Sequence, residues 1–551
     1  MKRACLIIIV LILSIFSSSV MAQRVRGIPP ERPKLVVAIV VDMMRYDYLT
    51  RYWGDFEKGG FKRLVQEGTL CKNTNLNYIY TQTGVGHATI FTGATPAVHG
   101  IVSNEWYVRN RNTTEYCVDY PDVKEVGGKH QNKKMSPKNL LASTIGDEIK
   151  LFNNGKSKVI GISIKDRAAV LSAGRSADAA YWYDDVTGDW MTSSYYMDTL
   201  PKWVKKFNKK KLADFYLEKT WDLFLPADQY DESLPDDNEY ETGFNRGQKV
   251  FPYNLAELTL DDREKRNYKL LKHTPYGNTY TKDFALAAID NEGLGKDEYT
   301  DFLVVSFSCT DYIGHYFGPR SMEIQDTYLR LDQEIKHFVT FLDEQLGKEN
   351  IMIILTSDHG VADVPAYLQD QKLLGGIFRQ NYAMALLKAY LNALYGEGEW
   401  ISKYLDQQIY LNHELIEDAQ IPLEDIQRKC AEFMVQFSGV SHAFTSTDLK
   451  NTSFNSGLPR MVQNNYNPLR CGDILLSLNA GYIEDIAMCT THNSAYSYDT
   501  HIPLIWFGWK IRRNVIETPI EVTDIAATLA SILNISFPSG CFGKPLNDIV
   551  Q

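Results

Sequence analysis

The chain contains 551 residues, of which 44% are hydrophobic and 23% are charged. These values are ordinary for a globular protein and exclude a mostly disordered, collagen-like or multi-span membrane chain. The formal net charge of -10 argues against a nucleic-acid binder that relies on neutralising phosphates, because such proteins usually carry a basic surplus.

Residues 1–22 have the order of a secretory signal peptide. Lys2 and Arg3 precede an apolar run at residues 6–16, and small or apolar side chains then lead to Ala22. We predict cleavage after Ala22 and a periplasmic or secreted protein. The alternative is a retained membrane anchor, but the apolar run is shorter than the roughly 20 residues that span a bilayer. We therefore expect no anchor after cleavage.

The next segments alternate between buried strands and amphipathic helices. Continuous apolar runs predict strands that are covered on both faces; they lie at residues 34–41, 158–163, 302–307, 351–356 and 503–507. Helical patterns lie between them, at residues 139–152, 323–346 and 522–533. This alternation predicts an α/β fold with a mostly parallel central sheet flanked by helices.

Two long stretches interrupt the alternation. Residues from about 168 to 293 are rich in Tyr, Trp, Asp and Lys, and residues from about 366 to 480 contain helices of their own. Both are expected to be inserted cap or accessory regions, which α/β enzymes often use to select substrates. We therefore predict one catalytic domain over residues 23–551 with two insertions.

Acidic and histidine residues cluster where the predicted strands end. They are Asp42 after the first strand, Asp311 and His315 after the strand at 302–307, Asp358 and His359 after the strand at 351–356, and His501 before the last strand. Because parallel strands end at one edge of the sheet, these side chains are expected to lie close together. Mixed Asp and His sets suit zinc, and two zinc ions can stabilise the attacking and leaving oxygens of a displacement. Any one of these residues could instead be a cap or turn residue.

The joint pattern resembles the alkaline phosphatase superfamily, and most closely its PafA-like periplasmic phosphomonoesterases. The matching segments are residues 40–42 (VVD), 83–89 (TGVGHAT), 96–101 (PAVHGI) with Asn104, 164–167 (IKDR), 310–315 (TDYIGH), 356–360 (TSDHG) and 498–503 (YDTHIP). The resemblance implies two zinc ions, one held by Asp311, His315 and His501 and the other by Asp42, Asp358 and His359.

Thr83 is the candidate nucleophile. It precedes a Gly-rich turn and a helix predicted from about Val85 to Thr92, so its hydroxyl would lie at the positive end of that helix. The resemblance gives Thr83 the nucleophile's role, as a zinc-bound side chain that forms a phosphothreonine intermediate. Thr81 is the alternative in the same segment, and a helix cap is the purely structural explanation.

Asn104, Lys165 and Arg167 are the candidate phosphoryl-binding residues, a role that the resemblance implies. Lys165 and Arg167 follow a predicted strand at a spacing of two, and a Lys/Arg pair favours the extra charge of a monoester dianion. We therefore expect a zinc-dependent alkaline phosphatase that acts on small phosphate monoesters, binds no nucleic acid and works as a monomer. The alternatives are a phosphodiesterase or nucleotide pyrophosphatase of the same superfamily, and a non-catalytic exported binding protein.

Overall fold

The computed structural model describes residues 32–129, 134–244, 247–260, 266–486 and 488–550. The predicted signal peptide lies outside these ranges, so its cleavage stays a prediction. Residues from Pro33 onward form one compact unit. In the described part of the chain, none of the helices combines the length and the apolar character that crossing a membrane requires.

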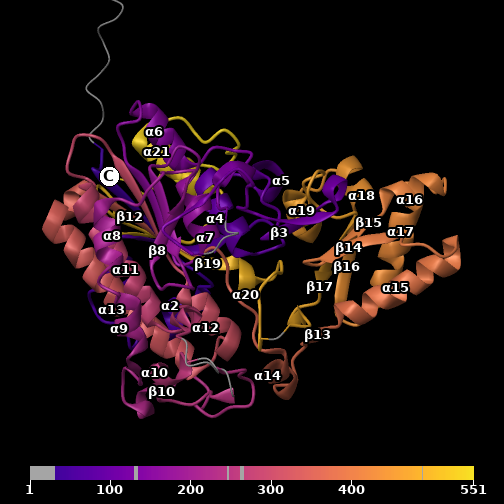
Figure 1. The fold of residues 1–551 in the computed structure, drawn as a ribbon, viewed down its shortest axis with the longest axis horizontal. Coiled ribbons are helices and arrows are strands. Elements are labelled where there is room, and N and C mark those ends of the chain that lie inside the picture. The colour runs from indigo at the N-terminus through magenta and orange to yellow at the C-terminus, as the bar shows by residue number, and fades with distance from the viewer. Residues whose placement is uncertain (1–31, 130–133, 245–246, 261–265, 487, 551) are drawn as a thin grey trace, which may run out of the picture. The chain divides into compact units, whose positions relative to one another are not determined.

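A single large sheet organises this unit (Figure 1). Within the described ranges, eleven strands form it: β20 (Asn514–Ile516), β2 (Thr69–Asn75), β19 (His501–Gly508), β12 (Ile351–Thr356), β1 (Leu35–Val41), β11 (Asp301–Phe307), β6 (Val159–Ser163), β7 (Ala179–Tyr183), β8 (Trp190–Ser193) and β5 (Glu125–Val126) in that order, with β21 (Ile520–Glu521) beside β2. Strands β12, β1, β11, β6 and β7 are parallel. The predicted α/β class is confirmed.

Strand β1 shows how an apolar run builds the middle of this sheet. All seven of its residues are buried. Leu35, Val37, Ile39 and Val41 belong to the hydrophobic core on one face, whereas Val36, Ala38 and Val40 belong to the core on the other. Helices α11 (Tyr276–Glu292) and α13 (Met322–Leu346) contribute to the first core, and α4 (Thr83–Thr92), α6 (Ile145–Phe152), α7 (Asp166–Ala173) and α21 (Asp524–Leu533) to the second.

One predicted strand runs against its neighbours. Residues 503–507 lie in β19, which pairs antiparallel with both β12 and β2. Strand β2 was not predicted, because its sequence TLCKNTN turns polar halfway and only its first three residues form a continuous buried run. The sheet therefore has a parallel centre and antiparallel pairs toward both edges.

The two predicted insertions differ in structure. Residues 168–293 supply β7, β8 and α11 to the central sheet and its cover, and only the segment that carries α8 (Lys202–Asn208), α9 (Leu212–Leu217), β9 (Thr220–Trp221) and β10 (Tyr253–Asn254) lies outside it. The second block instead builds a sheet of its own, in the order β14 (Ile401–Leu405), β15 (Gln408–Leu411), β17 (Ile474–Leu478) and β16 (Val440–Thr445).

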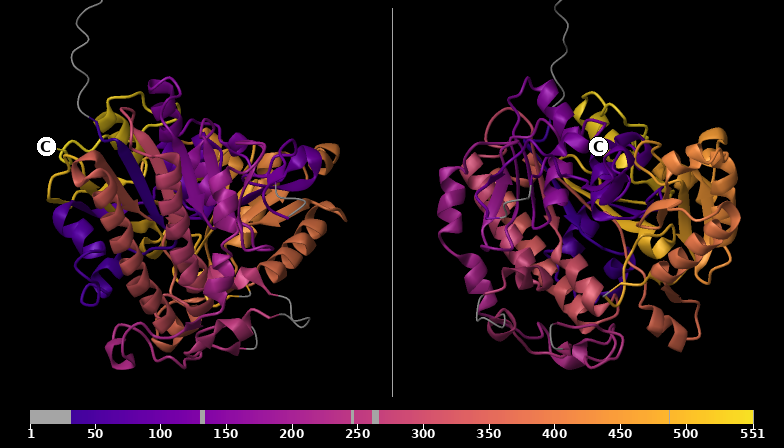
Figure 2. Two further views of the ribbon diagram at one scale, coloured as in Figure 1. Left: turned by 60° about the vertical axis from the view of Figure 1, so that its left-hand side comes forward. Right: turned by 45° about the vertical axis from the view of Figure 1, so that its right-hand side comes forward.

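Helices α15 (Gln380–Tyr395) and α17 (Leu423–Met434) pack on this smaller sheet around a separate hydrophobic core. A short parallel pair, β13 (Gly376–Phe378) and β18 (Tyr482–Glu484), flanks it in the chain. We call residues 376–484 the accessory region; it is the orange part beside the central sheet in Figures 1 and 2.

Candidate active site

The candidate site lies where the parallel strands end. In the registers of β1 with its neighbours, Val41 pairs with Phe307 of β11 and Val40 pairs with Thr356 of β12. Asp42 follows β1 directly, Asp358 is the second residue after β12, and helix α12 (Cys309–Phe317) brings Asp311 to the same edge. The three carboxylates are at most 3% exposed. Such a concentration of buried negative charge requires cations close by.

One group of ligand atoms surrounds His359. Its Nδ1 is 2.9 Å from the carbonyl oxygen of Gly360, so Nδ1 carries the proton and Nε2 keeps a free lone pair. That Nε2 lies 3.5 Å from Asp42 Oδ1 and 3.6 Å from Asp358 Oδ2. All three atoms are buried and make no hydrogen bond within the described residues. Oxygen and imidazole lone pairs without donors fit a bound cation, and this donor set suits zinc.

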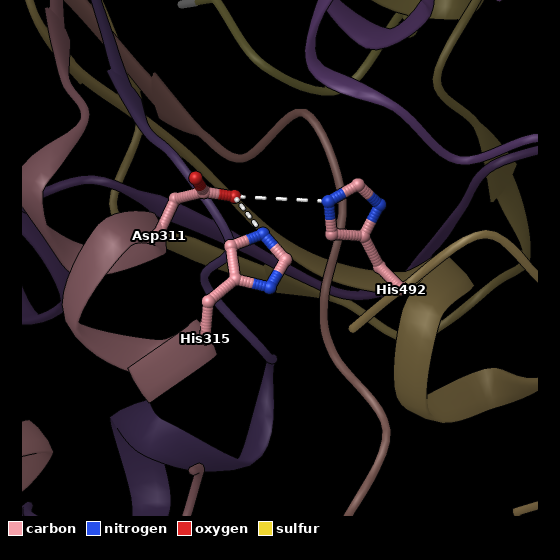
Figure 3. A group of neighbouring side chains, drawn as sticks. All are labelled: Asp311, His315 and His492. Atoms are coloured by element: carbon pink, nitrogen blue, oxygen red, sulfur yellow. Dashed lines mark ion pairs between the residues drawn. The ribbon is translucent and has the colours of Figure 1, made fainter. Parts of the chain in front are cut away.

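A second group surrounds Asp311 (Figure 3). His315 lies one helical turn after Asp311 in α12, and its Nδ1 is 2.9 Å from the Thr490 carbonyl oxygen. His492 comes from a loop on the opposite side, and its Nδ1 is 2.5 Å from the Thr81 carbonyl oxygen. Both Nε2 atoms therefore face Asp311 Oδ1, at 3.5 Å and 3.7 Å. Backbone carbonyls that fix the tautomer in this way are typical of histidine ligands to metals.

The structure places His501 outside both groups of metal-ligand candidates. His501 begins β19 at the expected edge, but its Nε2 is 2.7 Å from the Lys72 carbonyl oxygen and its ring stacks on Tyr46. His492 lies where the third ligand of this group was expected. Sequence reasoning missed it because it precedes no strand; the remaining signal was a histidine among Thr and Asn residues shortly before the last strand.

Thr83 begins helix α4 and is 1% exposed. Its Oγ1 lies 3.1 Å from Lys165 Nζ and 3.4 Å from Arg167 Nη2, which both donate to it. Helix α4 approaches the acidic edge closely, since a Cβ added to Gly86 would lie 2.4 Å from the Asp358 carbonyl oxygen. The structure thus sets the Thr83 hydroxyl against two cationic side chains beside the buried carboxylates.

Thr81, the alternative nucleophile, has a different environment. Its Oγ1 accepts hydrogen bonds from the backbone N–H groups of Asn493 and Ser494, at 3.1 Å and 3.2 Å. Its carbonyl oxygen accepts from His492. Thr81 therefore holds the loop that carries His492, a structural role that occupies its hydroxyl.

Lys165 is the most highly connected cation of the site. It is 2% exposed, and its Nζ lies 2.6 Å from Asp311 Oδ2 and 2.8 Å from Asp42 Oδ2. Burial lowers the pKa of Lys165, but the attraction of Asp311 and Asp42 outweighs it and holds the pKa above its ordinary value. Lys165 therefore remains charged and links the two groups of metal-ligand candidates.

Arg167 and Asn104 flank the nucleophile from other segments. Arg167 lies in the first turn of α7, and its Nη1 donates to the Tyr116 hydroxyl at 3.2 Å. Asn104 follows α5 (Pro96–His99), and its Oδ1 accepts from the Gly84 N–H at 2.9 Å. That contact leaves the amide nitrogen of Asn104 as its donor toward a ligand. The predicted phosphoryl-binding residues thus converge around Thr83.

A cleft of about 220 Å³ opens over these groups. Its lining includes Asn104, Arg167, Asp311, His315 and His492 together with Asp406, Gln407 and Glu484 of the accessory region. The cleft can therefore hold a small anion against Arg167, which contacts Thr83, in a space that the accessory region helps to line.

Comparison with known proteins places this arrangement in a family. Residues 36–487 match the type I phosphodiesterase / nucleotide pyrophosphatase family. The chain is 42% identical over 527 residues to a protein of Myroides odoratus named calcium-transporting ATPase, and the alignment covers 95% of each of the two chains. It is 38% identical over 536 residues to the alkaline phosphatase PafA of Elizabethkingia meningoseptica, and this alignment covers 96% of each of the two chains.

The fold is similar to that of PafA as well. A crystal structure of a PafA variant, in which a threonine is changed to serine and an asparagine, a lysine and an arginine are changed to alanine, matches with a TM-score of 0.90. The two chains are 38% identical, and the match covers 95% of this chain and 99% of the other. Similarity of this extent covers the central sheet and the accessory region together.

Proposed function

This chain belongs to the type I phosphodiesterase / nucleotide pyrophosphatase family and is a PafA-like phosphatase; we propose that it is a zinc-dependent alkaline phosphatase that hydrolyses phosphate monoesters through a phosphothreonine at Thr83. One observation carries the proposal. The Thr83 hydroxyl contacts both Lys165 and Arg167, and Lys165 also contacts Asp42 and Asp311, which belong to two sets of carboxylate and imidazole ligand candidates.

Two zinc ions would be held by the two sets. Asp42, Asp358 and His359 would form one site with Thr83, and Asp311, His315 and His492 would form the other. The buried lone pairs without donors support this assignment, and mixed oxygen and imidazole ligands suit zinc. When bound, the ions would lower the pKa of the Thr83 hydroxyl and neutralise charge on the leaving oxygen.

The residues of the chain would then act in two steps. Thr83 Oγ1 attacks phosphorus, the bond to the ester oxygen breaks, and the alcohol leaves. A water molecule attacks the phosphothreonine, which releases inorganic phosphate and restores Thr83. Lys165, Arg167 and Asn104 would bind the other phosphoryl oxygens in both steps, because each can donate hydrogen bonds toward Thr83 Oγ1 or the adjacent cleft.

The pair of cations supports a monoester rather than a diester. A monoester dianion carries one more negative charge than a diester, and Lys165 and Arg167 both reach the oxygen that would attack phosphorus. The PafA variant described above is altered at one threonine, one asparagine, one lysine and one arginine, the same four residue types. Phosphodiesterase activity is the second candidate, since the family is described by it.

Kinetics with paired substrates test the proposal. Purified, zinc-loaded protein should hydrolyse p-nitrophenyl phosphate with a kcat/KM at least about 100-fold above that for bis-p-nitrophenyl phosphate. Acid quenching followed by peptide mass spectrometry should locate the phosphate on Thr83. A preference for the diester would favour the second candidate, and no zinc with no turnover would favour a binding protein. The predicted export depends on residues 1–22 and is tested separately, by N-terminal sequencing of the mature protein.

A further inference from the structure

The cleft beside Thr83 is lined from two parts of the molecule. We call the part lined by Asn104, Arg167 and Asp311 its inner end; Lys165, which donates to Thr83 Oγ1, contacts Asp311 there. We call the part lined by Asp406 and Glu484 of the accessory region its outer end. Among the described lining residues, Arg167 is the only Lys or Arg side chain. A monoester whose phosphoryl group contacts Arg167 would therefore share the cleft with the carboxylates of Asp406 and Glu484.

Asp406 is fixed relative to the nucleophile. It lies in the turn between β14 and β15 at a φ of 48°, and its Oδ2 accepts a short hydrogen bond from the Ser103 hydroxyl. The same hydroxyl oxygen lies 2.9 Å from Gln82 Oε1, which accepts from the Asn104 N–H at 2.6 Å. Gln82 directly precedes Thr83. The Ser103 hydroxyl thus contacts both the carboxylate of the accessory region and the segment that carries the nucleophile.

Glu484 ends strand β18 on the same side of the cleft. Its Oε1 accepts a short hydrogen bond from the Tyr404 hydroxyl. Burial, together with the nearby negative charge of Asp406, raises the pKa of Glu484 to about 7. Both carboxylates have hydroxyl or amide partners, and neither forms an ion pair within the described residues. A cation that binds beside these two carboxylates would offset the repulsion between their negative charges.

We propose that Asp406 and Glu484 form a leaving-group subsite that selects monoesters of positively charged alcohols, such as aminoalkyl phosphates, and disfavours those whose leaving group carries a carboxylate or further phosphate. The inference rests on the proposed phosphomonoesterase function. The inner end accepts the phosphate of any monoester, so discrimination comes from the charge of the alcohol. The proposal places an ammonium group two carbons from the ester oxygen beside Asp406 and Glu484.

Three monoesters of equal length test this subsite: 2-aminoethyl phosphate, 2-hydroxyethyl phosphate and carboxymethyl phosphate. The kcat/KM of each is measured for the wild type, for Asp406→Asn and for Glu484→Gln. For each protein, the kcat/KM of the amine and of the carboxylate ester is divided by that of 2-hydroxyethyl phosphate. These ratios are then compared between each variant and the wild type, so that intrinsic differences between the leaving alcohols cancel. Each substitution should lower the relative value for the amine, and raise that for the carboxylate, roughly three- to tenfold.

Glu424→Gln is the matched control, because it removes one carboxylate from the exposed first turn of α17 and leaves the cleft unaltered. Its relative values should equal those of the wild type. If both cleft variants hydrolyse 2-hydroxyethyl phosphate and their relative kcat/KM values equal those of the wild type, the leaving-group subsite is overturned, but the proposed function is not. No hydrolysis of any of the three esters by wild type would overturn the proposed function.

A second measurement covers variants that fail to fold. 2-Aminoethylphosphonate and carboxymethylphosphonate have a P–C bond in place of the ester linkage, so they are not substrates for ester hydrolysis. Both should compete with p-nitrophenyl phosphate for the wild-type site. The inhibition constant of the amine should be at least about tenfold lower, and the difference should shrink as salt rises. Equal constants at low salt would contradict the proposal.

Discussion

The edge of the central sheet and the wall of the accessory region both present carboxylates to one cleft, but in different ways. At the sheet edge, Asp42, Asp311 and Asp358 are almost completely buried and face imidazole nitrogens and Lys165. At the accessory wall, Asp406 and Glu484 are half-buried and are held by hydroxyl groups. The first set belongs to the metal-ligand candidates, whereas the second lines the cleft with carboxylates that have hydroxyl partners.

The supporting structures differ in the same sense. The sheet edge is held by parallel strands whose cores lie on both faces; Asp42 and Asp358 follow the ends of β1 and β12, and α12, which follows β11, carries Asp311. The accessory region has its own hydrophobic core and contributes to the cleft through one turn and one short strand. We therefore expect changes at the sheet edge to abolish the reaction, and changes at the accessory wall to alter which ester is preferred.

The largest expected effect follows from removing the nucleophile. Thr83→Ala should lower kcat for p-nitrophenyl phosphate by at least about 10⁴-fold, because no other described hydroxyl at this edge has the contacts of Thr83 Oγ1. Zinc content, measured by mass spectrometry, should fall far less than activity. Thr83→Ser, which keeps a hydroxyl, should recover much of the rate. A Thr83→Ala protein that turns over at the wild-type rate would show that Thr83 is not the nucleophile.

The next effect separates two histidines that lie at the same edge of the sheet. His492→Ala should remove a ligand and lower both zinc content and kcat/KM, the latter by roughly 10²- to 10³-fold. His501→Ala should change kcat/KM by only a few-fold, since its Nε2 contacts the Lys72 carbonyl oxygen. Zinc analysis and steady-state kinetics on both variants check this. The reverse ranking would restore His501 as the ligand.

This pair of histidines also shows how much of the site could be predicted from the sequence. Residues within two positions of the end of a parallel strand, such as Asp42 and Asp358, could be located because the strand end fixes where they lie. The strand at 351–356 was predicted with the bounds that the structure has. His492 lies in a loop that donates hydrogen bonds to Thr81, 411 residues earlier in the chain, and no local periodicity reports such a contact.

The rest of the fold was harder to predict for a related reason. Strand β19 is apolar enough to be recognised, but its antiparallel direction depends on pairing with β2 and β12, which the sequence of β19 does not encode. The region at 168–293 shows a mixed composition although it supplies β7 and β8 to the sheet. The pairing of Asp406 with Ser103 likewise joins residues 303 positions apart.

A smaller effect should follow from the substrate-binding cations. One cation about 4 Å from the extra charge of a monoester contributes on the order of 4 kcal/mol before solvation losses, at an effective dielectric constant near 20. Replacing both Lys165 and Arg167 by Ala should therefore lower kcat/KM for p-nitrophenyl phosphate at least about 100-fold more than for bis-p-nitrophenyl phosphate. Equal losses on both substrates would remove this basis for monoester selection. The variant's zinc content serves as the control for damage to the metal sites.

The smallest expected effect concerns the pH dependence of the accessory wall. The pKa of Glu484 is raised to about 7, so its carboxyl is largely protonated at pH 6 and ionised at pH 8. The titratable groups that face it are Tyr404, which donates a hydrogen bond to it, and Asp406, which repels its charge. Preference for a permanently charged ester, 2-(trimethylammonio)ethyl phosphate, over 2-hydroxyethyl phosphate should therefore rise a few-fold as the pH increases through about 7.

The ratio of kcat/KM cancels the pH dependence of the sheet edge, which both esters share. Glu484→Gln should make the ratio flat with pH; a rise that persists in this variant would mean that another group of the cleft, and not Glu484, senses the cation.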